Sequence, residues 1–326
     1  MSAHAQHQSP APAVALSRHG DADGPSWSLF DKIGLGAAWV AGISLCVIAA
    51  AICLYMLFKG IEFLSLDQLV TSPNPSLNQA KSGGFLDPLL GTLILTVIGT
   101  LIAAPVGIGI AVWLSEYGRP AGLARAVESG VEIVAGTPTI VLAIFGLLVF
   151  QNGAFSFLSF TAAGGAVFGK SFLTAGAIMS LIAIPLVVGG TREALQAIPQ
   201  HVREASYALG KDRASTIRRV LLPASRPGIG TGVALGMGRI IGDTAIVVIL
   251  LGASQTLQGQ GGTPILGTLR GTGSTLTSYV YNNSPAGEGG APEKAYAAAF
   301  VLLLMVIGLN FTIDTISRRR KAAWKK

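Results

Sequence analysis

Charged residues are scarce in this chain of 326 residues. Asp, Glu, Lys and Arg together make up 12% of the sequence, whereas soluble domains usually carry about 25%. Hydrophobic residues account for 51%, and the mean hydropathy is +0.59. So few charges cannot cover a surface that faces water, and so much apolar character excludes a disordered chain. The composition therefore favours a protein whose solvent is a lipid bilayer.

Cysteine is also rare, and the two cysteines present exclude a fold held together by disulfides. Cys46 and Cys53 lie in one apolar run. On a helix their separation is about 10 Å, which is too far for a disulfide. The net charge is +7, but the basic residues do not lie on a soluble face, and the histidines lack the spacing of metal ligands. We expect no nucleic acid partner and no metal site.

Long windows with little or no charge organise the rest of the chain. Each is long enough to cross a bilayer, which takes about 20 mostly apolar residues. The first window is too long for a cleaved signal and lacks a basic segment before it, so we interpret it as an anchor. We predict an all-α integral membrane protein with six transmembrane helices, near residues 33–58, 91–114, 131–150, 171–190, 229–252 and 295–316.

The distribution of Lys and Arg predicts the orientation. With both termini in the cytoplasm, most basic residues fall on the cytoplasmic side, as the positive-inside rule requires. The first 25 residues are rich in Ala, Ser, His and Pro, which is typical of a disordered tail. The predicted parts are a disordered cytoplasmic tail at 1–30, a first transmembrane helix and extracytoplasmic loop at 31–90, a core of five transmembrane helices with a cytoplasmic loop (191–228) at 91–316, and a basic cytoplasmic tail at 317–326.

One segment matches a nucleotide-binding pattern. The run from Gly164 to Ser171 fits G-x-x-x-x-G-K-[ST], in which backbone N–H groups hold phosphates and Lys170 would reach them. The alternative is a glycine-rich turn between two spans. The predicted orientation puts this loop outside the cell, and no soluble α/β domain surrounds it. We therefore favour the turn and keep a P-loop nucleotide-binding protein as an alternative.

The cytoplasmic loop has its own local structure. Pro199 opens a short helix that runs to Leu209, and Gly210 stops it. Asp212 is placed to cap a second helix, which Pro223 would end. A DNA-binding helix pair would need a supporting core, and this loop is too short to supply one. A merely solvated basic loop is the simpler alternative.

The residues of this loop resemble the EAA loop of ABC-importer permeases. That signature places E-A-A, a glycine and I-x-L-P at fixed spacing, and the spacing fits here, with Ser206 in place of the second alanine and Val220 in place of isoleucine. The resemblance implies a coupling helix that docks on a cytoplasmic ATPase. The residues that carry this role by resemblance are Glu204, Ala205, Ser206, Gly210, Val220, Leu222 and Pro223.

Three further stretches are similar to phosphate permeases: Gly136–Val141, Gly238–Ala245 and Thr275–Tyr281, the last being closer to the A-type (PstA) subunit than to its C-type partner. The resemblance implies the type I (MetI-like) permease architecture in a bacterial inner membrane, and phosphate import by alternating access. It also implies a non-enzymatic subunit without a cofactor. ATP and Mg would be bound by a partner ATPase dimer. The other partners would be a C-type permease, an extracytoplasmic phosphate-binding protein and membrane lipid.

Two alternatives to phosphate import remain, besides nucleotide binding. Molybdate and sulfate permeases share the same architecture, so another oxyanion is a possible substrate. A secondary transporter would carry its substrate without ATP or partners. Internal inverted repeats would favour it, and the sequence shows none.

Ionisable and hydroxyl residues within the spans are candidates for the substrate path. Arg239 and Asp243 are four residues apart, so on a helix they share one face. Arginine suits a tetrahedral oxyanion, and a carboxylate can accept a proton-bearing P–OH. The alternative is an intramembrane ion pair that only orients the helix. Thr137 and Thr139, beside Pro138, could contact the passing ion or simply satisfy the backbone around a proline kink.

Overall fold

The computed structural model describes residues 28–73, 83–159, 169–252, 256–257, 264–287 and 289–322. They belong to two compact units, Met1–Leu54 and Tyr55–Lys326. Helix α1 (Leu29–Phe63) begins in the first unit and ends in the second. Most of the predicted N-terminal tail lies outside the described residues.

A capping box opens α1. The backbone N–H of Ser28 donates to Asp31 Oδ2 (3.0 Å), and the backbone N–H of Asp31 donates to Ser28 Oγ (3.2 Å). These two bonds satisfy N–H groups that the first turn of a helix leaves unpaired. From Ile33 to Phe58 the helix carries no charge, as expected for a span. Cys46 and Cys53 are both free thiols, as their spacing predicted.

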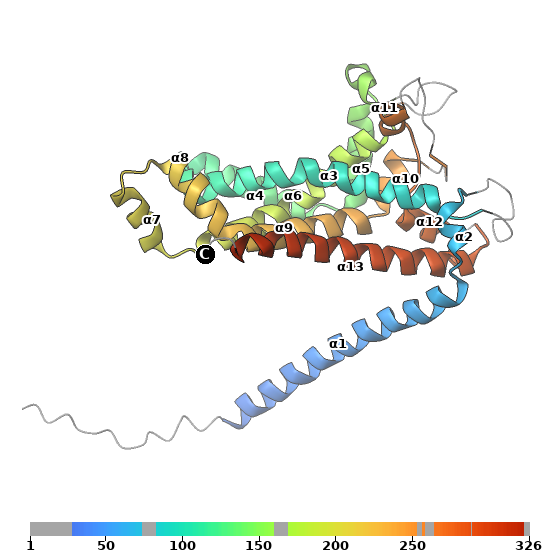
Figure 1. Cartoon of the computed structure of the whole chain (residues 1–326), viewed down its shortest axis with the longest axis horizontal. Coiled ribbons are helices and arrows are strands. Elements are labelled where there is room, and N and C mark those ends of the chain that lie inside the picture. Colours follow the sequence, from blue (N-terminus) through green and yellow to red (C-terminus); the bar gives the residue numbers. More distant parts are fainter. Residues whose placement is uncertain are drawn as a thin grey trace, which may run out of the picture. The chain divides into compact units, whose positions relative to one another are not determined.

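The second unit is a bundle of helices, and the described residues form no strand. Figure 1 shows α3, α6, α9 and α13 running along the bundle, with α7 and α8 at one end and α2 and α12 at the other, while α11 lies in the part that projects at the top of the view. The elements after α1 are α2 (Leu66–Val70), α3 (Leu86–Val112), the π turn η1 (Trp113–Tyr117), α4 (Ala121–Gly136), α5 (Thr139–Phe150), η2 (Gly153–Leu158), α6 (Phe172–Gln196), α7 (Gln200–Ala208), α8 (Arg213–Thr216), the π turn η3 (Ile217–Leu221), α9 (Leu222–Gly242), α10 (Ala245–Leu250), α11 (Pro264–Leu269), α12 (Leu276–Asn283) and α13 (Pro292–Ala322).

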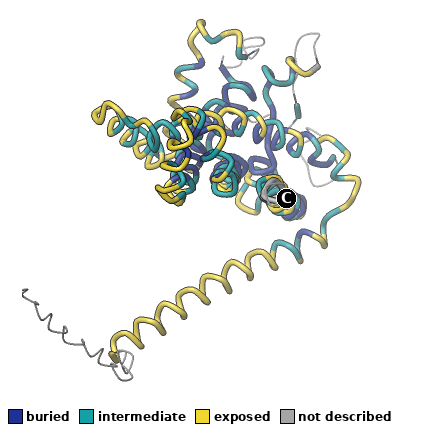
Figure 2. The backbone as a smooth tube through the Cα atoms, turned by 60° about the vertical axis from the view of Figure 1, so that its left-hand side comes forward, coloured by how far each residue is buried: buried dark blue, intermediate teal, exposed yellow. Residues whose placement is uncertain are grey.

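The bundle centres on α6, which packs against α3 on one side and α9 on the other. Its buried residues form the main core together with buried residues of α3, α5, α9 and α10. Figure 2 shows the buried positions gathered inside the bundle. Glycine lets α6 and α9 approach closely, because a Cβ placed on Gly190 would lie 2.7 Å from the Cα of Gly232. Small residues at such crossings are typical of helices packed within a membrane.

The six predicted spans are not all confirmed as single helices. Four helices of the described chain are long and apolar enough to cross a membrane: α1, α3 with η1, α6 and α13. The bent pair α4 and α5 makes a fifth if it counts as one span. The predicted span at 229–252 is two helices, since α9 ends at Gly242 and α10 begins at Ala245.

The predicted span at 131–150 is not straight. Helices α4 and α5 meet at an angle of 107°. The break falls at Thr137 and Pro138, whose backbones are extended (ψ 130° and 134°). Proline disfavours the helical conformation in the residue before it and lacks the N–H that a continuing helix would use. The sequence predicts a proline kink here, and the structure shows a full break between two helices.

The end of the bundle opposite α7 is held by buried polar contacts. Asp87, in the first turn of α3, accepts hydrogen bonds from Ser72 Oγ (3.0 Å) and from the backbone N–H of Leu257 (3.1 Å). Thr92 Oγ1 accepts from the backbone N–H of Leu276 at the start of α12. Burial raises the pKa of Tyr279 on α12 to about 12, so its phenol stays neutral at physiological pH. These contacts attach the connecting loops to α3.

Candidate functional site: the coupling loop and the substrate path

The loop at 191–228 contains the two short helices that its sequence predicts. Helix α7 begins after Pro199 and ends at Ala208, and Gly210 follows with φ +77°, a conformation that favours glycine. Glu204 and Ala205 are exposed on α7. The exposed part of α7 therefore includes a carboxylate and a small residue, and the small residue permits a close approach by another surface.

Ser206 replaces the second alanine of the EAA signature, and the structure gives this replacement a physical reason. Its hydroxyl lies 2.8 Å from Thr216 Oγ1, and both residues are buried. The bond joins α7 to α8. Asp212 caps α8 by accepting from the backbone N–H of Ser215 (3.3 Å), as predicted. The Ser206–Thr216 bond thus connects the two short helices directly.

The end predicted for the second helix is wrong. Pro223 does not end it, because η3 continues directly into α9, which begins at Leu222. Pro223 follows the π turn η3 directly and lies near the start of α9. Val220 and Leu222 flank the buried Leu221 and are themselves partly buried. The I-x-L-P part of the signature therefore forms the continuous helical entry from the loop into α9.

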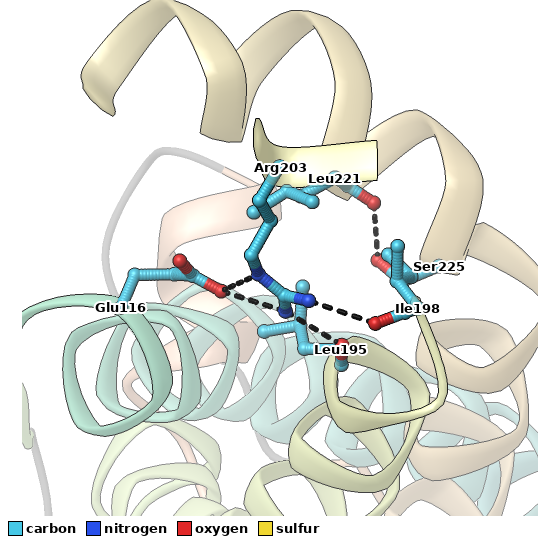
Figure 3. A network of polar contacts seen from close by, with 6 residues as sticks. All are labelled: Glu116, Leu195, Ile198, Arg203, Leu221 and Ser225. Carbon is cyan, nitrogen blue, oxygen red and sulfur yellow. Dashed lines mark hydrogen bonds and ion pairs between the residues drawn. The ribbon is translucent and has the colours of Figure 1, made fainter. Parts of the chain in front are cut away.

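Sequence reasoning missed the most connected side chain of this region. Arg203 on α7 donates through Nε (3.3 Å) and Nη2 (3.0 Å) to Oε1 of Glu116 on η1. It also donates to the carbonyl oxygens of Leu195 (2.9 Å) and Ile198 (2.8 Å) at the end of α6 (Figure 3). Glu116 and Arg203 are 87 residues apart in the sequence, so no local pattern links them.

Arg239 and Asp243 do not form the ion pair that their spacing allows, because the helix ends between them. Asp243 follows the last residue of α9, is buried, and accepts from the backbone N–H of Ile246 through Oδ1 (3.0 Å), thereby capping α10. Arg239 is exposed and makes no ion pair or hydrogen bond with the residues that the structure describes. The two residues therefore do not neutralise each other.

The two threonines beside Pro138 differ in their hydrogen bonding. Thr137 Oγ1 donates to the carbonyl of Ile133 in the preceding turn (2.7 Å), which matches the backbone-satisfying role. Thr139 is half-buried at the start of α5, and no hydrogen bond of its hydroxyl occurs within the described ranges. Helix α5 packs against α10, so the two breaks lie on neighbouring elements.

The nucleotide-binding pattern falls largely on residues that the structure does not describe. Ser171, its last residue, is described and fully buried. Its hydroxyl accepts from the backbone N–H of Thr174 (3.1 Å) and so caps α6. A capping role explains this serine without a bound phosphate. Within the described part of the chain, no cluster of His, Cys, Asp and Glu could hold a metal ion.

Comparison with known proteins identifies the family. Residues 103–322 match the family described as "Binding-protein-dependent transport system inner membrane component". The chain belongs to this family. It is therefore a multi-pass membrane subunit of a transporter and not an enzyme, which sets aside the P-loop protein and the secondary transporter.

Curated relatives are named as phosphate permeases. "Phosphate transport system permease protein PstA 1" of Mycobacterium tuberculosis (strain ATCC 25618 / H37Rv) is 31% identical over 255 residues, 75% of this chain and 74% of the relative. "Phosphate transport system permease protein PstC" of Xylella fastidiosa (strain 9a5c) is 31% identical over 307 residues, 89% of each. Both names occur at the same identity, so the A-type assignment rests on the Thr275–Tyr281 stretch alone.

Solved structures with the same fold are ABC-importer permeases. A chain of the structure titled "Inward facing conformations of the MetNI methionine ABC transporter: CY5 native crystal form" aligns with a TM-score of 0.54 and 21% identity, covering 72% of this chain and 95% of that one. A chain of "Crystal structure of a bacterial ABC transporter involved in the import of the acidic polysaccharide alginate" aligns with a TM-score of 0.59 and 18% identity, covering 89% and 98%. The fold is thus the MetI-like permease fold.

Proposed function

We propose that this chain is a permease subunit that passes inorganic phosphate into a bacterial cell in an ATP-driven importer. Its A-type character, six spans and cytoplasmic termini are part of the proposal. A C-type permease would form the path with it, and a phosphate-binding protein would deliver the ion from outside. An ATPase dimer carrying ATP and Mg would bind the coupling loop, and closure of that dimer would drive alternating access.

The observation that carries the proposal is the open guanidinium of Arg239, one turn before the break between α9 and α10. Arginine stays charged when desolvated, and its fork of donors matches two oxygens of a tetrahedral oxyanion. An ionisable residue within a membrane protein usually faces a pathway. The PstA and PstC names of relatives that match most of the chain support phosphate as the anion.

Asp243 supports phosphate over sulfate. Its Oδ1 is used to cap α10, while Oδ2 accepts no hydrogen bond from the described residues. At neutral pH phosphate still carries a P–OH proton, which a carboxylate oxygen can accept. Sulfate is fully ionised, so it would meet only repulsion there. The short Asp side chain stands where related permeases carry Glu, so the backbone break at Gly242 would have to bring the ion closer.

The coupling residues take their proposed roles from the loop geometry. Glu204 and Ala205 would contact the ATPase directly, since both are exposed on α7. Ser206 and Gly210 would maintain the shape of the loop. Val220, Leu222 and Pro223 would carry motion of the loop into α9, because η3 and α9 form one continuous element.

Replacing Arg239 by Gln tests the function. In the complete transporter reconstituted in liposomes, we expect ATP-driven phosphate uptake to fall about 100-fold or more, because two charge-assisted hydrogen bonds contribute about 1.5–3 kcal/mol each. Arg226→Gln is the matched control: it lies on the same helix about 20 Å away and should retain uptake. Normal phosphate uptake by the Arg239→Gln transporter would contradict the proposed role.

A further inference from the structure

Helix α3 changes its winding where it meets the coupling loop. Its last turn, η1, is a π turn, and the backbone N–H of Gly118 closes it on the carbonyl of Trp113 (2.8 Å). A π turn holds one residue more than an α-helical turn, so the side chains at its end are rotated by about 100°. Such turns are uncommon and occur frequently at functional sites. Here the turn carries Glu116.

Arg203 connects three elements at this point (Figure 3). From α7 it reaches Glu116 on η1 and the carbonyl oxygens of Leu195 and Ile198 at the end of α6. The Leu195 carbonyl lies in the last turn of α6, at the negative end of the helix dipole, so it favours a cation as the carboxylate does. The neighbouring Arg213 lies over the ring of Tyr117, 5.5 Å from its centroid, which gives the loop a second contact with η1.

This ion pair differs from the others that the described residues form. The side chains of Arg203 and Glu116 are 14% and 6% exposed, whereas those of Arg192 and Glu128, which join α6 to α4, are 40% and 33% exposed. Solvent and salt screen the exposed pair, but they screen the buried pair much less. A buried pair with further hydrogen bonds therefore holds its elements in one defined geometry.

We propose that Arg203 is a positioning residue that makes α7, η1 and the end of α6 move as one rigid body. The inference rests on the proposed function, because it assigns the route by which an ATPase displacing α7 would reach the spans. The motion would enter α3 and α6 together through the Arg203 guanidinium. Motion through η3 into α9 would follow a separate, covalent route.

The ratio of phosphate transported to ATP hydrolysed tests this rigid connection between α7, η1 and the end of α6, called the joint below. If Arg203 only supported folding, its loss would lower phosphate transport and ATP hydrolysis together. In reconstituted transporters we expect Glu116→Gln and Arg203→Lys to keep the ATPase rate within about twofold and to lower this ratio about tenfold. Lysine retains the charge, but one ammonium cannot reach Glu116 and both α6 carbonyls at once. Glu128→Gln and Arg192→Lys are the matched controls and should keep the wild-type ratio. An unchanged ratio in the Glu116 and Arg203 variants would overturn the proposal.

A distance measurement decides the matter even if those variants fail to assemble. The distance is measured between two spin labels, one at Ala208→Cys on α7 and one at Arg119→Cys just after η1. Cys46 and Cys53 are replaced by Ala so that only these two positions are labelled. In otherwise wild-type transporters the distance should be the same in the nucleotide-free and ATP-trapped states, and a change between these states would overturn the proposal. This result does not depend on the substrate. If the wild-type transporter imported another oxyanion, the phosphate proposal would fail while the joint could still be tested.

Discussion

The coupling loop and the substrate path differ in how far this chain satisfies its own polar groups. In the loop, Arg203 and Ser206 are paired with Glu116 and Thr216 inside the protein. In the path, the Arg239 guanidinium has no partner among the described residues. A loop of this kind can reach its working shape within one chain. A path lined by Arg239 fits the proposal that an anion and a second permease complete it.

The largest expected effect disturbs both regions, because α6 and α9 connect them. In Gly190→Ala the new methyl group would lie 2.7 Å from the Cα of Gly232, and backbone cannot move aside as a side chain can. We expect a loss of about 1–3 kcal/mol of stability, seen as a lower thermal midpoint in detergent. Gly189→Ala is the matched control, since a Cβ there meets nothing within 4 Å. Equal midpoints for the two variants would show that the close crossing is not needed.

A smaller effect is confined to the coupling loop. Ser206→Ala restores the alanine of the EAA signature but leaves the buried Thr216 hydroxyl without its partner, which should cost about 1–2 kcal/mol. Adding Thr216→Val removes that unpaired group, so the double variant should recover part of the loss. A double-mutant cycle on thermal stability measures the coupling. Strictly additive effects would mean that the loop does not depend on this bond.

The smallest effect separates the two roles of Asp243. Asparagine can still cap α10, so Asp243→Asn should change stability by only a few tenths of a kcal/mol, whereas Asp243→Ala should lose about 1 kcal/mol. Both variants remove the carboxylate, so both should reduce phosphate uptake. If Asp243→Asn kept full uptake, Asp243 would serve only as a helix cap. The substrate path would then have one fewer polar group left free for an anion, and it would differ less from the coupling loop.

The coupling loop was predictable because its contacts are local. Pro199, Gly210 and Asp212 act through the backbone within a few residues, and the structure confirms the role of each. The error at Pro223 came from treating a proline as a helix end when it can also occupy a first turn. The Arg203–Glu116 pair joins residues far apart in the sequence, so no local pattern could reveal it.

The path was harder to predict because hydropathy does not report breaks in a helix. The window 229–252 is apolar throughout apart from Arg239 and Asp243, yet the helix ends at Gly242. A buried Asp that caps a following helix and a salt-bridged Asp look alike in sequence. At Pro138 the sequence predicts a kink, but it does not predict a bend of 107°. The geometry around Arg239 and Asp243 therefore could not be predicted from hydropathy and spacing, and their role in the path stays a prediction.

The most direct test of the central claim is uptake of labelled phosphate by the complete reconstituted transporter. We expect uptake that requires ATP on the cytoplasmic side and the binding protein outside, and that excess sulfate or molybdate does not inhibit. ATP-driven uptake of another oxyanion in place of phosphate would contradict the assigned substrate. Uptake that proceeds without ATP or partner subunits would contradict the role as an importer subunit.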